Sequence, residues 1–365
     1  MDFRALKTLH PNYSDLELHF FNMKFLGLCD PLLDTKVSRP ILELWDDKNL
    51  AEIDFLVDEK DSPYSINGEE VLFEGQKLPF TSYLLGRLSL DMPYFYVRGP
   101  LGGELACPTL DDQNLLNLNH HQICSGCDFC SYGERNTNKI NQSVEEILAS
   151  AKKEHGLDKF DQLAFVTGCF RDEEETCSHL VRAIKFANKS GFNGRVLYIG
   201  FQLTSDKVIN TILRELKNPQ RFEYVYTIER FTERSQIMHG PKGKKDIAEL
   251  VSVIQKLSSY NFGNLQYTYL VGIEDLDPFY AHAPKLVPYA TPHISIFRRT
   301  GLGLKAECFA KDYIAGGADY LCKVRDYFES LYGHQIIGNN LANLWLFPRE
   351  RVDRFRERIE QRRTK

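Results

Sequence analysis

The alternation of helical and strand patterns over residues 140–300 is the feature that most constrains the fold of this 365-residue chain. Short apolar runs that read as strands alternate there with amphipathic segments that read as helices, with short turns between them. Strands separated by helices pair in parallel through right-handed crossovers. The pattern therefore predicts an α/β fold, a partial (β/α)6 barrel of the TIM type, with its six strands at 115–121, 162–166, 195–200, 222–228, 265–271 and 293–297.

Start and stop signals set the expected helices of this region. Ser143 followed by Glu146 forms a capping box, in which each side chain binds a backbone N–H group of the first turn. A glycine, Gly191, closes the helix that follows the second strand. The helices are expected at 143–155, 173–189, 205–216, 245–260 and 278–287.

The segments on either side of the barrel have different patterns. Residues 1–105 contain short β-like pieces and turn signals without a clear alternation, so we expect an α+β extension that packs on the barrel. Residues 106–300 form the barrel. Residues 301–365 are amphipathic and end in an arginine-rich stretch, so we expect a helical C-terminal extension.

Three cysteines, Cys124, Cys127 and Cys130, follow the first expected strand closely. Thiolates this near one another on a loop can reach a single metal centre. Three ligands do not complete the four-ligand shell that iron–sulfur clusters and structural zinc normally take. An open position is where a substrate or cofactor binds, and active sites of barrels gather at the C-terminal ends of the strands. The triplet is therefore the strongest functional signal in the chain.

The triplet, its place after the first strand and the α/β units that follow resemble the radical S-adenosylmethionine superfamily. Cys127-Asp-Phe-Cys130 matches the second half of the family motif, with Phe129 as the aromatic residue before the last cysteine. The gap between Cys124 and Cys127 is two residues, one fewer than is usual. The resemblance implies that the three cysteines hold a [4Fe–4S] cluster whose free iron binds S-adenosylmethionine. It also implies reductive cleavage of S-adenosylmethionine to start radical chemistry on a substrate.

The resemblance implies further contacts with S-adenosylmethionine. Thr167-Gly168-Cys169 stands where the family has a glycine-rich turn that binds the methionine amino group. Glu229 stands where a polar or acidic residue meets the ribose. Arg230 or Arg234 stands where a basic residue meets the carboxylate.

Two later segments also resemble family positions. Gly272 belongs to a strand segment that backs the adenine, and Ile294 is in the position of an apolar adenine contact. His239-Gly-Pro-Lys-Gly243 resembles a glycine turn that opens the next helix. The expected cofactor-binding residues are therefore Phe129, Thr167, Gly168, Cys169, Glu229, Arg230, Arg234, Gly272 and Ile294.

Other readings of the triplet stay open at this point. The cysteines could form a zinc site with Cys107, His120 or His121 as the fourth ligand, in a zinc-stabilised α/β binding protein without redox chemistry. A cluster that only stabilises the fold is a third possibility. For a radical enzyme, rearrangement, bond cleavage, and carbon–carbon or carbon–sulfur bond formation are all compatible with the sequence.

Composition and charge restrict partners and compartment. Lys plus Arg is 45 and Asp plus Glu is 50, a net charge of −5, which makes nucleic acid an unlikely partner. The sequence has no run of 18 apolar residues, so we predict no membrane span. The nine cysteines are odd in number and the N-terminus lacks a secretory pattern, so we expect a reducing cytoplasm. The expected partners are a small-molecule substrate and, from the resemblance, an electron donor such as flavodoxin or ferredoxin.

Overall fold

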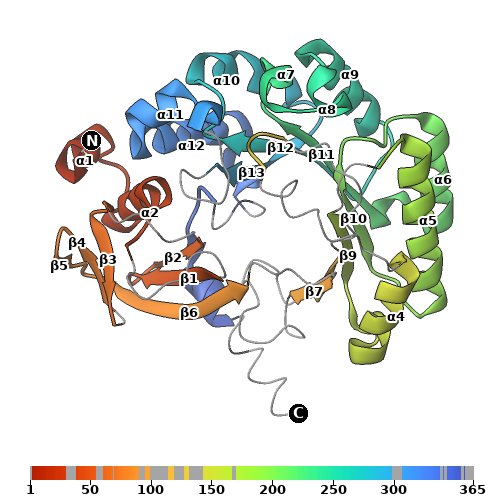
Figure 1. Ribbon diagram of the computed structural model, residues 1–365, viewed down its shortest axis with the longest axis horizontal. Helices are drawn as coiled ribbons and strands as arrows, with labels where there is room; N and C mark the ends of the chain where they lie inside the picture. The colour runs from red at the N-terminus through yellow and green to blue at the C-terminus, as the bar shows by residue number, and fades with distance from the viewer. Residues whose placement is uncertain are drawn as a thin grey trace. The chain divides into compact units, whose positions relative to one another are not determined.

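The computed structural model divides into two compact units. Figure 1 labels the helices and strands of the chain. The α/β unit comprises Met92–Tyr269 and Lys285–His293, and the terminal unit comprises Met1–Asp91, Leu270–Pro284 and Ile294–Lys365. The structure describes residues 2–29, 38–54, 61–68, 70–89, 95–98, 114–118, 127–130, 143–166, 170–297, 306–337, 340, 343–354 and 357.

The largest sheet has the order β13-β12-β11-β10-β9-β8-β7, in which β8 to β13 form a parallel sheet of six strands. This confirms the predicted fold class. The short strand β7 was not expected; it pairs antiparallel with β8 and extends the sheet at that edge. The strands are β7 (Phe95–Arg98), β8 (Leu115–Leu118), β9 (Gln162–Val166), β10 (Arg195–Gly200), β11 (Phe222–Glu229), β12 (Asn264–Val271) and β13 (Thr291–Ile296).

The helices between these strands begin and end close to their predicted bounds. At the first of them, the Ser143 hydroxyl accepts a hydrogen bond from the Glu146 N–H at 3.3 Å, and the Glu146 carboxylate accepts one from the Ser143 N–H at 2.7 Å. The expected capping box is therefore present. The helices are α4 (Val144–His155), α5 (Glu173–Lys189), α6 (Asp206–Leu216), α9 (Ile247–Ser258) and α10 (Leu276–His282).

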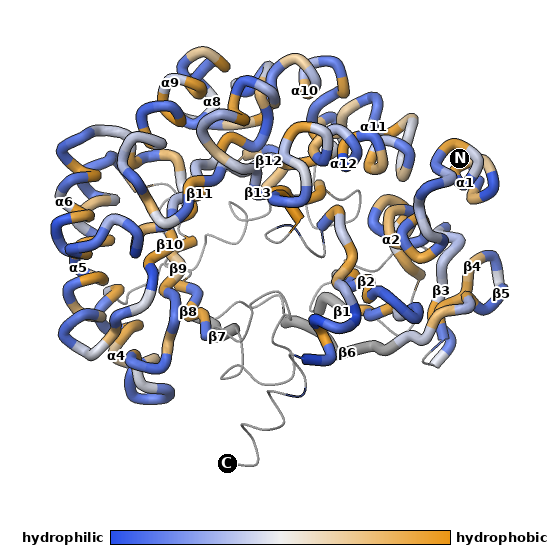
Figure 2. Tube along the Cα trace, turned by 180° about the vertical axis from the view of Figure 1, so that it is seen from behind, coloured by the Kyte–Doolittle hydropathy of each residue, from blue (hydrophilic) through white to orange (hydrophobic). Residues whose placement is uncertain are grey.

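Helices cover one face of the sheet in the α/β unit. Figure 2 shows α4, α5 and α6 with hydrophilic and hydrophobic residues interspersed, as expected of helices with one buried face. On the sheet face beneath them, Tyr198 and Tyr224 are buried with ring centroids 5.2 Å apart, and Tyr226 lies 6.0 Å from Tyr224. This aromatic layer forms the core between the sheet and its helices.

The opposite face of the same sheet carries polar side chains. Arg195 Nη1 lies 2.6 Å from Glu223 Oε1, and Gln162 donates to the other oxygen of that carboxylate. Burial raises the pKa of Glu223, while Arg195 and Gln162 oppose that rise. Since side chains alternate between faces, these groups project away from the tyrosine layer. The inner face of the sheet can therefore accommodate polar groups.

The terminal unit contains two further sheets. One has the order β14-β2-β1-β6, from β1 (Ser38–Trp45), β2 (Asn49–Asp54), β6 (Thr81–Ser89) and β14 (Phe347–Pro348); the other has the order β3-β4-β5, from β3 (Tyr64–Asn67), β4 (Glu70–Phe73) and β5 (Gln76–Lys77). Its helices include α1 (Phe3–Leu9), α2 (Asp15–Leu26), α10, α11 (Lys311–Gly316) and α12 (Ala318–Tyr332). The expected α+β and helical extensions are thus present, and β14 adds a C-terminal strand to the N-terminal sheet.

Among the described helices, none combines the length and the apolar character that crossing a bilayer requires.

Candidate functional site

The structure describes only part of the expected metal site. Cys127, Phe129 and Cys130 lie in a described turn, whereas Cys124 falls outside the described residues. Within the described part of the chain, no group of three His, Cys, Asp or Glu side chains is arranged to hold a metal ion. Other residues singled out from the sequence that also fall outside the described ranges are Thr167, Gly168, Cys169, Cys107, His120 and His121.

The turn brings two of the expected metal ligands close together. The Cys130 N–H donates to the Cys127 carbonyl at 2.8 Å, a bond that closes a four-residue turn. Both thiols are half-buried and form no disulfide. Two cysteines held in this way have the donor chemistry that an iron–sulfur cluster or a zinc ion requires. The residues present therefore fit a thiolate-bound metal centre.

The cysteine turn packs against a segment that follows β11. We name residues 234–244 the docking segment; it contains α7 (Arg234–Ile237) and α8 (Pro241–Lys244). The Asp128 N–H donates to the Ile237 carbonyl at 2.9 Å, and Asp128 Oδ1 lies 3.1 Å from His239 Nε2. One backbone and one side-chain contact thus join the turn to the docking segment.

A third contact joins the same two parts through Phe129. The ammonium of Lys242, in α8, lies 5.8 Å from the centroid of the Phe129 ring. A cation within about 6 Å of a ring centroid is attracted by the negative face of the ring. The aromatic residue of the motif therefore faces the docking segment.

A β-bulge at the end of β11 sets the direction of Glu229. The pairing register with β12 shifts between Thr227 and Glu229, and the Ile228 N–H donates to the Thr268 hydroxyl at 3.0 Å. Glu229 has a φ of 72°, a left-handed conformation that costs about 1–2 kcal/mol for a residue with a Cβ. Bulges of this kind redirect side chains, and many lie beside active sites.

Glu229 is directed toward the docking segment. Its Oε1 atom lies 2.8 Å from Nζ of Lys242, and the side chains of Glu229 and Lys242 are only 16% and 12% exposed. Because both charges are mostly shielded from water, this ion pair is screened less than a surface pair. Lys242 therefore contacts both Glu229 and the cysteine turn.

Arg234 fixes the backbone around this pair. Its buried guanidinium donates to the carbonyl of Ile228, to that of Arg230 at 2.6 Å and to that of Lys242 at 2.7 Å. Gly243 is also required here, because a Cβ at this position would lie 2.2 Å from the Met238 carbonyl oxygen. The end of β11 and the docking segment are thus tied together through main-chain atoms.

Arg230 has fewer hydrogen-bond acceptors than Arg234 among the described residues. It is only 8% exposed, and among the described residues its one acceptor is Glu233 Oε2 at 3.4 Å. Its Nε atom has no partner within that same part of the chain. A buried cation with so little compensation is unfavourable unless an anion approaches it. Arg230 therefore has the character of an anion-binding group.

Gly272 and Ile294 lie in the terminal unit. Gly272 has a φ of 105°, and a Cβ there would lie 2.8 Å from the Tyr313 ring. Ile294 is fully buried, and its N–H donates to Asn340 Oδ1 at 2.6 Å. Packing accounts for the identity of both residues, and their expected contacts with adenine stay predictions.

Sequence reasoning missed the contacts of Asp128, His239 and Lys242. The His239-Gly-Pro-Lys-Gly243 stretch was noted only as a turn that opens the next helix, and α9 in fact begins after it with its own cap at Asp246. The available signal was the Gly-Pro-Lys-Gly pattern, which is typical of a tight turn. It could not indicate what the turn would contact.

No protein-family model matches this sequence, and none of the curated proteins matches it. Among solved structures, Streptococcus suis SuiB matches at 11% identity with a TM-score of 0.41, over 59% of this chain and 46% of SuiB. SuiB bound to S-adenosylmethionine matches at 10% identity and a TM-score of 0.40, over 59% and 49% of the two chains. HydG, a maturase of the [FeFe]-hydrogenase, matches at 18% identity with a TM-score of 0.41, over 60% of this chain and 54% of HydG.

The chain thus spans about half the length of these solved structures. A likeness with a TM-score near 0.4 is too loose to assign an activity.

Proposed function

We propose that this chain is a radical S-adenosylmethionine enzyme. In this proposal Cys124, Cys127 and Cys130 hold a [4Fe–4S] cluster, and S-adenosylmethionine binds beside it at the end of β11. One observation supports the proposal most. The cysteine turn packs against the docking segment, and Lys242 of that segment forms an ion pair with Glu229. The expected metal ligands and the expected ribose contact thereby belong to one locally connected structure.

The chain's own residues would bind and orient S-adenosylmethionine. When bound, the cluster would supply the single electron that cleaves the sulfonium. Lys242 lies 2.8 Å from one oxygen of Glu229, and a carboxylate can accept hydrogen bonds from ribose hydroxyls. The bulge and the left-handed φ of Glu229 fix its direction before any ligand arrives.

Of the two arginines expected near the cofactor carboxylate, we assign that role to Arg230. Arg234 already donates to three backbone carbonyls, so its guanidinium serves the local fold. Arg230 is buried with one long contact to Glu233, and a carboxylate would supply the charge that it lacks. Lysine in place of Arg230 would lose the two-pronged geometry of the guanidinium, so Arg230→Lys should still weaken binding.

The remaining expectations belong to the same proposal. The substrate would be a small molecule, and an electron donor such as flavodoxin or ferredoxin would reduce the cluster in the cytoplasm. The reaction would be a rearrangement, a bond cleavage, or carbon–carbon or carbon–sulfur bond formation. Phe129, whose ring lies 5.8 Å from the Lys242 ammonium, would contribute to cofactor binding beside the cysteines.

The proposal is tested by anaerobic reconstitution with iron and sulfide, followed by reduction in the presence of S-adenosylmethionine. We expect brown protein with about four irons per chain, and formation of 5′-deoxyadenosine. Cys127→Ser should lose both the iron and the cleavage, whereas Cys177→Ser, at a buried cysteine of α5, should keep both. Colourless protein with about one zinc per chain would favour the binding protein. A cluster without cleavage would favour a purely structural role.

A further inference from the structure

We propose that Lys242 is a positioning residue for S-adenosylmethionine, which fixes the direction of the Glu229 carboxylate and ties it to the cysteine turn. This inference rests on the proposed function, because it concerns the same binding site. It assigns a role to Lys242, which the family resemblance covers only as part of a glycine turn. Lys242 would act through Glu229 rather than by touching the cofactor.

The local fold fixes where Lys242 lies. Its carbonyl accepts a hydrogen bond from Arg234 at 2.7 Å, and the next residue, Gly243, approaches the Met238 carbonyl too closely to carry a side chain. The backbone of Lys242 is thus held by a buried guanidinium on one side and by close packing on the other. The ammonium reaches Glu229 from this fixed base at 2.8 Å.

The ion pair with Lys242 engages one oxygen of the Glu229 carboxylate. Lys242 binds Oε1, and within the described part of the chain no group binds Oε2, so that atom can accept a hydrogen bond from a ligand. The two side chains are 16% and 12% exposed, so removing the ammonium would leave the carboxylate partly buried without compensation. Without the ammonium, Oε1 would also lose the contact that fixes the direction of the carboxylate, and Oε2 would no longer be held in one place for a ligand. Lys242 therefore keeps the Glu229 carboxylate in position as an acceptor.

The ion pair of Glu229 and Lys242 is also linked to the cysteine turn. The same ammonium lies 5.8 Å from the ring centroid of Phe129. In the sequence, Phe129 stands between Cys127 and Cys130, two of the expected metal ligands. Independent contacts of Asp128 with Ile237 and with His239, at 2.9 and 3.1 Å, hold the turn against the same segment. The distance between the cysteine turn and Glu229 is thus set by one short piece of chain. Within the docking segment, the Lys242 side chain contacts both Glu229 and Phe129 of the cysteine turn.

The decisive experiment is a double-mutant cycle for S-adenosylmethionine binding, measured by calorimetry on anaerobically reconstituted protein. Lys242→Met keeps the aliphatic stem and removes the charge, and Glu229→Gln removes the acceptor charge. We expect each variant to bind about tenfold more weakly, on the scale of a partly buried ion pair. The double variant should bind S-adenosylmethionine no more weakly than the single variant with the lower affinity. Lys242→Arg, which keeps the charge, should recover most of the affinity.

The matched control is Lys244→Met, which removes an exposed lysine at the end of the same short helix and should bind like the wild type. A second readout uses the metal-free protein, in which Lys242→Met should speed amide hydrogen exchange in residues 127–130 while Lys244→Met should not. This measurement needs neither cluster nor cofactor.

Three outcomes would overturn the inference. If Lys242→Met binds S-adenosylmethionine like the wild type, Lys242 has no role in positioning. If the effects of Lys242→Met and Glu229→Gln simply add, Lys242 does not act through Glu229. If the reconstituted wild type does not bind S-adenosylmethionine at all, the proposed function fails first and the positioning role fails with it.

Discussion

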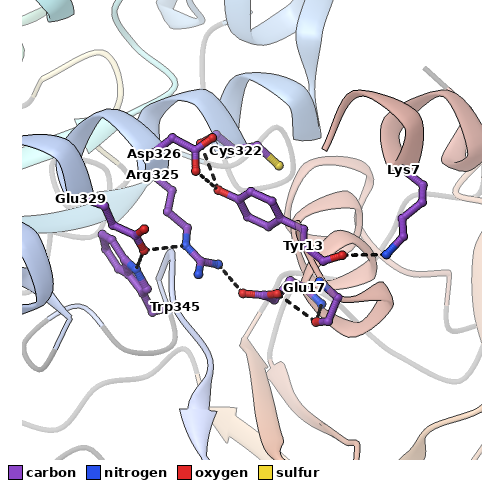
Figure 3. Close-up of polar contacts among 9 residues, drawn as sticks. Lys7, Tyr13, Glu17, Cys322, Arg325, Asp326, Glu329 and Trp345 are labelled. Atoms are coloured by element: carbon purple, nitrogen blue, oxygen red, sulfur yellow. Dashed lines mark hydrogen bonds and ion pairs between the residues drawn. The ribbon is translucent and has the colours of Figure 1, made fainter. Parts of the chain in front are cut away.

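Arg325 on α12 places its Nη1 atom 2.7 Å from Glu17 Oε1 on α2, and so joins two helices that are 308 residues apart in the sequence (Figure 3). Arg325 Nε also lies 3.1 Å from Glu329, which accepts a hydrogen bond from the Trp345 indole at 2.5 Å. The Arg325 guanidinium lies 4.8 Å from the Tyr13 ring centroid. Helices α2 and α12 of the terminal unit are therefore held together by a mostly buried charge network.

We expect Glu17→Gln to lower the free energy of unfolding by about 2–3 kcal/mol, because it leaves Arg325 without one of its two carboxylates. Glutamine can still complete the capping box with Ser14 through its one oxygen, which leaves its NH2 group, a donor, facing Arg325. Although burial opposes ionisation, Arg325 holds the pKa of Glu17 below its usual value. Urea unfolding at pH 7 measures the effect. Glu70→Gln, in an exposed pair with Lys77, should change stability by less than about 0.5 kcal/mol; equal effects would contradict the account.

His19 should make the stability of the terminal unit depend on pH. It lies among aromatic rings, stacked on Phe3 at 4.0 Å with Nδ1 2.9 Å from the Tyr64 hydroxyl, and burial lowers its pKa to about 4 while Asp15 opposes the shift. The unfolded chain, with a histidine pKa near 6.5, then binds more protons than the folded chain between about pH 4 and pH 6.5.

The contribution of His19 is therefore complete above about pH 6.5 and lost as the pH falls toward 4, by about 3 kcal/mol in total. Unfolding free energies measured across this range for the wild type and for His19→Gln test the prediction. As the pH falls, the unfolding free energy of His19→Gln should decline less steeply than that of the wild type. His334→Gln, at an exposed position, should keep the wild-type slope. Parallel curves for the wild type and His19→Gln would refute the assignment.

Arg234→Lys should loosen the docking segment even though the charge is kept. A single ammonium cannot reproduce the planar geometry with which Arg234 binds the carbonyls of Ile228, Arg230 and Lys242. We expect a loss of about 2–4 kcal/mol of stability, with faster amide exchange at residues 234–244. Arg182→Lys, in an exposed pair with Glu145, provides the control and should have little effect. A docking segment that exchanges at the wild-type rate in Arg234→Lys would show that these bonds do not hold it.

Much of the α/β unit could be predicted from the sequence, because its information is local. The strand and helix positions follow from periodicity, and caps such as Ser143 are set by residues three apart. The bulge at Glu229 could not be predicted, because it depends on the register between β11 and β12. Helix α2 gave no amphipathic pattern, since most of its residues are buried all round the helix.

The candidate site shows the same division. The sequence placed Cys127, Phe129, Glu229 and Arg230 at strand ends, but it could not tell which arginine was already used by the backbone. That distinction between Arg230 and Arg234 needs the three carbonyl positions. The link from the cysteine turn to Lys242 joins residues more than a hundred positions apart and has no sequence period to reveal it.

The central claim is that three cysteines leave one iron of a cluster open to S-adenosylmethionine. The most direct test is electron–nuclear double resonance of the reduced, reconstituted protein with S-adenosylmethionine labelled with ¹⁵N at its amino group and ¹⁷O at its carboxylate. The account predicts hyperfine coupling of both labels to the cluster, lost in Cys127→Ser together with the cluster. A reduced cluster that shows no coupling to either label in the wild-type protein would contradict it.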